Sequence, residues 1–286
     1  MGGGVHLHVA SGFSARHGAF PPPSDLVARA AEHAIGTLPL TDRDNVTGTV
    51  RFAKAAMAAG VRPVFGVDLA VAPCLPTSSQ APARGRTPVR GGAHVVEAPL
   101  RDTLPAKNAA GWGRLSRIVS AAHLADGVPT ASRETLQAYA GEDLAVRLGP
   151  ASRAGAPPHG GPDRYRRAAA RAVAGTGRGW SSAEGLVVRL AGMGPGSGRL
   201  AAHTLGPADR LGIPAVLGNA VRYADPGQNR LADVLDAARL LRPVDRWRLD
   251  CGERWLKGPD ETAAVAERRT RASWSCSASA WTAPRS

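Results

Sequence analysis

The sequence predicts one large α/β domain. Along its first third, short apolar segments alternate with amphipathic segments of about ten residues, a pattern that is typical of parallel strands covered by helices. The 286 residues are 43% hydrophobic, so the chain has enough apolar side chains for one substantial core. Prolines and glycines separate several of these segments, which places turns between them. Together these observations favour a sheet with helix-covered faces.

Each predicted element has a local signal. Ser24 follows three prolines and is expected to cap the first helix. Gly60 follows the second helix and is expected to adopt the left-handed conformation there. The expected strands, in chain order, are 5–9, 37–40, 61–72, 98–107, 144–148, 185–190 and 213–217. The expected helices are 25–34, 50–59, 111–122, 132–139, 197–211 and 228–241, with a short basic helix near 163–173.

Three segments lack a regular pattern. Residues 74–92 and 149–182 are rich in Gly, Pro and Arg, so we expect long disordered loops there. After residue 267 the periodicity ends, which predicts an irregular, unstructured tail over 268–286; out-of-frame translation of a truncated gene would explain it. We also expect the apolar face of helix 228–241 to be partly exposed. Its members are Leu231, Val234 and Leu241.

Composition argues against several classes of protein. The net charge is +13, and Lys54, Lys107 and Lys257 are the only lysines. Such an arginine excess, with abundant Ala, Gly and Pro, is typical of GC-rich coding DNA, so it says little about nucleic acid, although arginine favours phosphate contacts. The 3 cysteines form no CxxC pair, which argues against disulfides and structural zinc. No apolar run is long enough to span a bilayer, and no secretory signal opens the chain, so we expect a cytoplasmic location.

The most informative segment covers residues 5–69. It begins VHLHVASGFSARHGAF, continues through TLPLTDRDNVTGTVRFAKAAMAAG and ends in VRPVFGVDL. A strand with His-x-His, a second strand that ends in the acidic TDxD turn, and a third strand that contains Asp68 bring imidazoles and carboxylates to strand ends. Two or three divalent ions that orient a water molecule and bind a phosphate need ligands of these types.

These motifs resemble the PHP (polymerase and histidinol phosphatase) domain that opens the bacterial DNA polymerase III alpha subunit. The resemblance extends through AKNxxGWxxLxxxVSxAH at Ala106–His123 and NAVRYADPGQxRLADVLDAARLL at Asn219–Leu241. Within the family, the sequence is most similar in general character to the error-prone polymerases of high-GC actinobacteria. It implies a distorted TIM-like (β/α)7 barrel over residues 1–267. In active members of the family, the barrel holds divalent ions that hydrolyse phosphoesters.

The resemblance also implies that most metal ligands are replaced. The residual candidates are His8, His17 and Asp68, which would hold at most one weakly bound divalent ion (Zn, Mn or Mg). The substituted ligand positions are Ala10, Arg43, Ala220 and Arg222, and the remaining His of the family aligns near Arg101. An arginine a few ångströms from a metal ion is repelled by about one to several kcal/mol. We therefore expect no cluster of metal ions.

Other interpretations of these residues stay open. His6 and His8, in the first strand, fit hydrogen-bonded histidines inside a barrel. The aspartates of the TDxD turn fit helix caps or partners of Arg43. Arg43 and Arg222 are expected to replace the metals with ion pairs. Their expected partners are Asp42, Asp44 and Asp68.

Three functions follow from this. The first is a catalytically inactive structural PHP domain of a DNA polymerase III alpha subunit, acting in DNA replication and error-prone repair, with DNA or replisome subunits as partners. The polymerase aspartates of the family lie beyond this domain, so we expect that active site to be missing. The second function is a metal-dependent phosphoesterase or 3′–5′ exonuclease. The third is an arginine-rich module for single-stranded DNA, whose affinity would fall steeply with salt. The number of replaced ligands favours the first.

Overall fold

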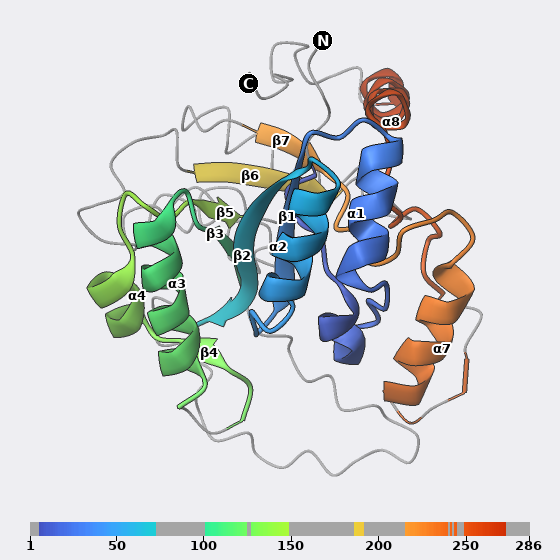
Figure 1. Ribbon diagram of the computed structural model, residues 1–286. Coiled ribbons are helices and arrows are strands. Elements are labelled where there is room, and N and C mark those ends of the chain that lie inside the picture. The colour runs from blue at the N-terminus through green and yellow to red at the C-terminus, as the bar shows by residue number, and fades with distance from the viewer. Residues whose placement is uncertain are drawn as a thin grey trace.

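The computed structural model describes residues 6–72, 101–124, 127–148, 186–191, 215–239, 241, 243–244 and 249–272. Figure 1 shows its elements. In chain order they are the 3₁₀ helix η1 (Gly12–His17), α1 (Pro23–Glu32), β1 (Thr37–Arg43), α2 (Thr49–Ala58), β2 (Arg62–Val71), β3 (Arg101–Pro105), α3 (Ala109–Ala122), β4 (Thr130–Ala131), α4 (Arg133–Tyr139), β5 (Val146–Leu148), β6 (Leu186–Ala191), β7 (Ala215–Gly218), α7 (Asn229–Arg239) and α8 (Pro259–Ala272).

The described strands form a mixed seven-stranded sheet in the order β1-β2-β3-β5-β6-β7, with β4 paired to β2. The pairs β1–β2, β5–β6 and β6–β7 are parallel, as the alternation of strands and helices predicts. Strand β3 is antiparallel to both β2 and β5, which that alternation did not predict. Antiparallel neighbours need no helical crossover, and residues 73–100 carry Pro, Ser, Gly and Arg without a helical period.

A short N-terminal segment closes this sheet into a barrel. Three residues after β7, Val221 bonds to both sides of Val9: its amide donates to His8 O at 3.0 Å, and its carbonyl accepts from Ala10 N at 3.0 Å. On the other side, the carbonyl of Val9 accepts from the amide of Thr41 in β1 at 2.8 Å. The segment around Val9 therefore lies between the last strand and the first, and the α/β barrel that we expected is confirmed.

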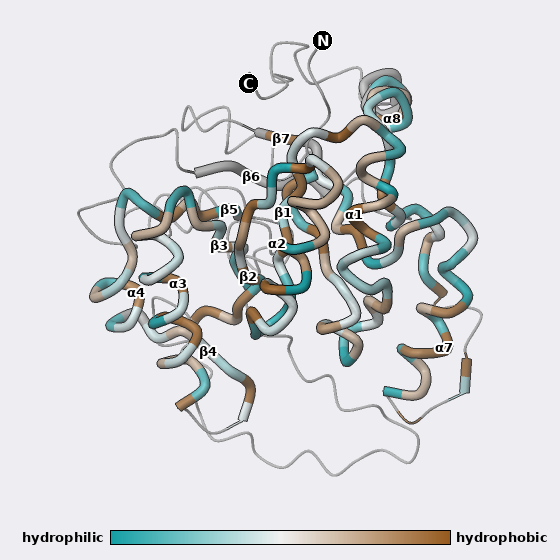
Figure 2. Tube along the Cα trace, in the orientation of Figure 1, coloured by the Kyte–Doolittle hydropathy of each residue, from teal (hydrophilic) through white to brown (hydrophobic). Residues whose placement is uncertain are grey.

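Two apolar clusters pack the helices against the outside of the barrel. The first joins α1 and α2 to β1 and to the closing segment, with Leu26, Phe52 and Val221 fully buried. The second joins α3 to β2, β3 and β5. Figures 1 and 2 show these helices lying along strands that carry hydrophobic residues. Alternate strand residues face opposite ways, so the other face of the same strands is left for polar side chains inside the barrel.

Local signals set most element boundaries. Gly60, the second residue after α2, has a positive φ of 68°, as expected. Helix α1 differs from the prediction, because it begins at Pro23 with Pro22 in the N-cap position and no capping side chain. Proline suits the first helical turn, where its missing N–H has no helical partner in any case. Ser24 therefore lies inside the helix rather than before it.

Some predicted segments lie outside the described residues. They are the loops 74–92 and 149–182, the helices near 163–173 and 197–211, and residues 273–286. At the C-terminal end, α8 continues to Ala272, beyond residue 267 where we expected regular structure to stop. Within the part of the chain that the structure describes, no helix has the length and apolar character needed to cross a membrane.

Candidate functional site

The barrel interior carries a polar cluster where the first strands meet. Asp68 of β2 pairs in register with Thr103 of β3. His8 lies across from both: its Nδ1 is 3.1 Å from Thr103 Oγ1, and its Nε2 is 3.9 Å from Asp68 Oδ2. We expected the histidines of the predicted strand 5–9 to be hydrogen-bonded. This is confirmed, since His6 Nε2 also lies 2.7 Å from the carbonyl oxygen of Lys257.

Arg101 is the central cation of this cluster. It opens β3, and its side chain is only 4% exposed. Its Nη2 donates to Asp44 Oδ1 at 2.6 Å and to the carbonyl of Asp68 at 2.5 Å, and its Nε donates to Asp68 Oδ2 at 3.3 Å. The amide of Asp44 also bonds the carbonyl of Asp68 at 2.9 Å. One guanidinium at the start of β3 therefore links Asp44, just after β1, to Asp68 within β2.

His17 and Arg43 lie on the outer side of the same carboxylate. His17 Nε2 and Arg43 Nε are each 3.9 Å from Asp44 Oδ2, and their side chains are 30% and 31% exposed. Burial, followed by the positive charges of Arg43 and Arg101, lowers the pKa of His17 to about 4. His17 is therefore a neutral imidazole at physiological pH.

Asp42, near the end of β1, bonds the loop that follows the segment around Val9. Its carboxylate accepts hydrogen bonds from the amide of Ser11 at 2.7 Å, from Ser11 Oγ at 2.8 Å and from Ser14 Oγ at 2.6 Å. Burial raises the pKa of Asp42, while these donors oppose that shift. Ser14 Oγ also accepts from the amide of Arg43 at 2.8 Å. The role of Asp42 is to fix η1 against the end of β1, and it forms no ion pair with Arg43.

Arg222 does not point toward the aspartates that we expected. Its Nη1 donates to Asp250 Oδ2 at 3.1 Å, its Nη2 to Asp236 Oδ2 at 2.9 Å, and its Nε to the carbonyl of Gly18 at 3.3 Å. Tyr223 reinforces this second cluster, because its hydroxyl donates to Asp250 Oδ1 at 2.8 Å. The prediction that Arg222 would pair with Asp42, Asp44 or Asp68 is therefore wrong: its partners come from α7 and from the chain before α8.

The two alanines at former ligand positions act through their backbones. The amide of Ala10 donates to the carbonyl of Val221 in the strand pairing that closes the barrel. Ala220 lies just before that pairing with a positive φ of 49°. A methyl group offers no ligand atom at either position.

The described side chains do not fit the family's metal site. Within the residues that the structure describes, no three His, Cys, Asp or Glu side chains are grouped as a metal site. The expected ligands His8 and Asp68 lie close together, but His17 is grouped with Asp44 instead. Arg101 already bonds both carboxylates. From the sequence alone we did not predict that Arg101 bonds these carboxylates. The only indication was that a histidine ligand of the family aligns near Arg101.

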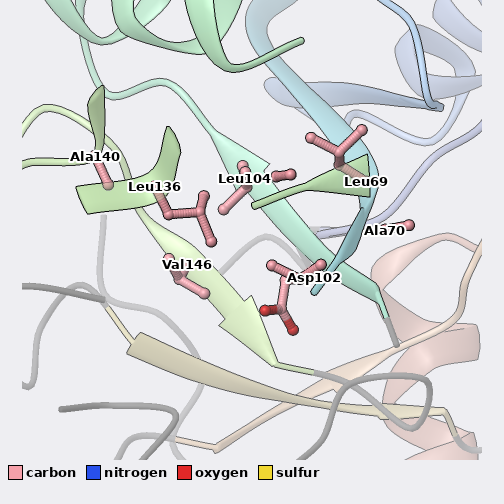
Figure 3. A pocket seen from close by; sticks show the side chains of 9 residues that line it. Leu69, Ala70, Asp102, Leu104, Leu136, Ala140 and Val146 are labelled. Carbon is pink, nitrogen blue, oxygen red and sulfur yellow. The ribbon is translucent and has the colours of Figure 1, made fainter. Parts of the chain in front are cut away.

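A separate small pocket lies on the outer face of the barrel wall. It is lined by apolar residues of β2, β3, β4, α4 and β5, with Asp102 as its only charged residue. Figure 3 shows the Asp102 side chain between the strands, near Val146 and Ala70. Asp102 faces the opposite side of β3 from its neighbours Arg101 and Thr103, so this pocket is not part of the polar cluster.

Comparison with known families identifies the class of protein. The model of the PHP domain matches residues 6–190, and the chain belongs to this family. Among curated relatives it is 32% identical over 279 residues to an error-prone DNA polymerase of Mycolicibacterium paratuberculosis, covering 94% of this chain and 23% of the relative. It is 33% identical over 271 residues to an error-prone DNA polymerase of Mycobacterium tuberculosis, covering 91% and 23%. The chain thus spans about a quarter of the length of these relatives.

Solved structures give a more distant likeness. An amidohydrolase from Chromobacterium violaceum is 18% identical, with a TM-score of 0.47 over 79% of this chain and 89% of that one. The resemblance to the PHP domain of error-prone polymerases, stated from the motifs alone, is confirmed by the family match and by the curated relatives.

Proposed function

We propose that this chain is a structural PHP domain of the error-prone DNA polymerase type, without hydrolytic activity of its own. The observation that supports this most strongly is the buried guanidinium of Arg101, which bonds Asp44 at 2.6 Å and Asp68 at 3.3 Å. In an active barrel, carboxylates at this position would bind ions that activate water. Here their charge is balanced by a side chain that activates nothing.

The proposed role is to provide a rigid surface for the polymerase machinery. The curated relatives are DNA polymerases about four times as long as the matched segment, so we propose DNA or other replisome chains as partners. We further propose that residues 1–267 act as one PHP unit. Figure 1 shows helices α1 to α4 lying along the strands of the sheet.

A metal-dependent phosphoesterase is the second candidate. Two observations favour it: His8 and His17 each lie 3.9 Å from a carboxylate oxygen, at the ligand positions that the family resemblance indicates. A single ion bound weakly at His8, His17 and Asp68 would be the minimal form of such a site. It would have to displace Arg101 from Asp68.

Metal content and hydrolysis distinguish the two functions. The purified chain is analysed for bound metals and is assayed on a phosphodiester and on single-stranded DNA with a 3′ end, with added Mn²⁺ or Zn²⁺. We expect less than one tightly bound ion per chain and no turnover. Metal-dependent turnover that disappears in His8→Ala and in Asp68→Asn would refute the structural role.

A further inference from the structure

We propose that the outward side of α7 is a docking surface for a partner protein, and that the partner presents an amphipathic helix whose apolar side is bordered by acidic residues. This deepens the proposed function, because it names the surface through which a structural domain would join the polymerase machinery. It rests on that function only for the kind of assembly. The chemistry of the partner is argued from α7 itself.

The first argument is where the exposed apolar side chains gather. Among the described residues, nine large apolar side chains are exposed, and five of them lie within residues 231–249. In α7, Leu231 is 48% and Val234 is 53% exposed. Figures 1 and 2 show α7 at the outer edge of the molecule, with hydrophobic residues along it. Exposed apolar side chains that gather on one element are typical of an interaction site, whereas those of an ordinary surface are scattered singly.

The second argument is that polar bonds hold α7 with its apolar side outward. Asp236 accepts a hydrogen bond from Arg222 Nη2 at 2.9 Å, and Asp233 Oδ1 accepts from the amide of Asp250 at 2.6 Å. An amphipathic surface helix normally packs its apolar side against the core of its own domain. Turning α7 in that way would break both bonds and take Asp236 away from Arg222. The folding of this chain alone therefore does not account for the apolar side.

The third argument is the charge at the two edges of the apolar side. With about 100° of rotation per residue, Leu231 and Val234 lie on one stripe of α7. Arg230 borders one edge of the stripe, and Arg239, nine positions later, borders the other. Arg230 is exposed and forms no ion pair with another described residue, and Arg239 is 39% exposed and 3.6 Å from Asp236. Charged groups around an apolar centre select partners of opposite charge, so the edges favour a helix with carboxylates beside its apolar residues.

The same charges disfavour a second copy of this chain. In a symmetric pair of α7 helices the same surface of each copy would meet. The pair would bring two arginines from each chain to the edges, while Asp233 and Asp236 lie on the packed side of the helix. Like charges that meet across an interface are unfavourable. Single-stranded DNA is a poorer fit as well, because its phosphates would meet the arginines but not the apolar stripe.

The test measures the binding of synthetic helical peptides to the full chain by fluorescence anisotropy. Each peptide has three heptads, with leucine at both core positions of every heptad and one kind of charge at the flanking positions, so that copies of one peptide repel each other. We expect the glutamate-edged peptide to bind about tenfold or more tightly than the lysine-edged one. A scrambled peptide of the glutamate composition corrects for attraction to the net charge of +13. It should bind as weakly as the lysine-edged peptide.

Variants of α7 assign the binding to this helix. Leu231→Gln with Val234→Thr removes the apolar centre and should weaken binding of the glutamate-edged peptide by about tenfold or more. Arg230→Glu should weaken that peptide by about fivefold and strengthen the lysine-edged one. Arg117→Glu is the matched control, because it makes the same change of charge at an exposed position of α3. It should leave the preference between the two peptides as it is in the unaltered chain. Thermal unfolding of each variant checks that the fold is retained.

Several outcomes would overturn the proposal. One is equal affinity of the unaltered chain for the two peptides, and another is a loss in Arg117→Glu as large as that in Arg230→Glu. Self-association of the unaltered chain that disappears in Leu231→Gln with Val234→Thr, measured by sedimentation equilibrium, would make a second copy the occupant. An oligonucleotide that binds more tightly than either peptide, and only while Arg230 is present, would make it single-stranded DNA. Hydrolysis by a chain that still binds the glutamate-edged peptide would refute the proposed function and leave the docking surface standing.

Discussion

His17 makes the stability of this chain sensitive to mild acid. Burial and the charges of Arg43 and Arg101 lower its pKa from 6.5 to about 4 in the folded chain. Between these two values the unfolded chain binds a proton at His17 and the folded chain does not. The free energy of unfolding therefore falls as the pH drops from about 6.5 to about 4. Because His17 is partly exposed, its share of this loss should be on the order of 1 kcal/mol.

The variant His17→Gln tests this directly. Its unfolding by urea, measured at several pH values from 7 to 4, should show a smaller loss of stability than the unaltered chain over that range. His33→Gln removes an imidazole from a different part of the fold and serves as the control. An identical slope for His17→Gln and the unaltered chain would mean that His17 titrates normally.

The residues at the barrel end also show how far sequence reasoning reaches. His8 and Asp68 could be placed together because each lies in a recognisable strand motif. The partners of Arg222 could not be predicted, because Asp236 and Asp250 lie on later segments that no local pattern relates to it. The position of Arg101 is likewise decided by strand pairing across residues that are far apart in sequence. Ion pairs of this kind depend on tertiary geometry and leave no periodicity in the chain.

At the scale of elements, capping side chains and close backbone approaches fix where helices begin and how they pack. Ser132 and Asn108 accept bonds from backbone amides at the starts of α4 and α3, as residues of these types do. Helix α3 also depends on a close contact: a Cβ atom at Gly111 would collide with the backbone carbonyl of Asp143, whereas one at Gly113 would meet nothing within 4 Å. The same helix thus contains one glycine that packing requires and one that it does not.

Substituting each of these glycines by alanine should give opposite results. Gly111→Ala must push the 143 loop away from α3, and we expect it to lower the free energy of unfolding by about 1–3 kcal/mol. Gly113→Ala should raise it by about 0.5–1 kcal/mol, because alanine restricts the unfolded chain and favours the helix. Urea denaturation of both variants measures the difference. Equal effects at the two positions would contradict the close packing of α3 on this loop.

Helix α7 has its polar side toward the barrel. Ala232 and Asp233 are buried, and Asp236 pairs with Arg222. The apolar side faces outward, so Leu231 is 48% and Val234 is 53% exposed, and beyond the helix Leu241 is 93% exposed. The prediction of a partly exposed apolar face is confirmed. The helical period of the apolar residues was predicted correctly. However, the face of α7 that packs against the rest of the protein is held by ion pairs and not by leucine side chains.

Polar substitutions on this outer face should therefore be tolerated. We expect Leu231→Gln with Val234→Thr to change the free energy of unfolding by less than about 1 kcal/mol and to reduce binding of a hydrophobic dye. Phe52→Ala, in the fully buried cluster under α2, should cost about 3–5 kcal/mol. Thermal and urea unfolding of both proteins provide the comparison. A large loss of stability in the α7 variant would show that this face is covered.

At the scale of the whole molecule, Arg222 ties three distant segments together. It bonds the carbonyl of Gly18 after η1, Asp236 of α7, and Asp250. It lies one residue after Val221, which closes the barrel. Replacing it leaves Asp236, among the described residues, with only the longer ion pair to Arg239 at 3.6 Å and Asp250 with only that to Arg254 at 3.7 Å, and losing one partner of a buried pair is costly.

We expect Arg222→Met to lower the free energy of unfolding by about 3–5 kcal/mol. Amide hydrogen exchange should increase in η1, α7 and residues 249–256 together, because one side chain links them. Arg29→Met is the matched control: Arg29 pairs with Glu32 and Asp225 near the surface, so its loss should cost about 1 kcal/mol or less. Faster exchange confined to α7 would argue against a shared link.

The closing contacts also govern the order of events during synthesis on the ribosome. His6 contacts Lys257, which is 251 positions later in the chain, and Val9 pairs with Val221. The segment around Val9 therefore has no neighbour on one edge until residue 221 has been translated. Contacts of such long range slow folding, and an unpaired edge invites association between nascent chains. Chaperone binding before residue 221 emerges should therefore raise the yield of folded protein.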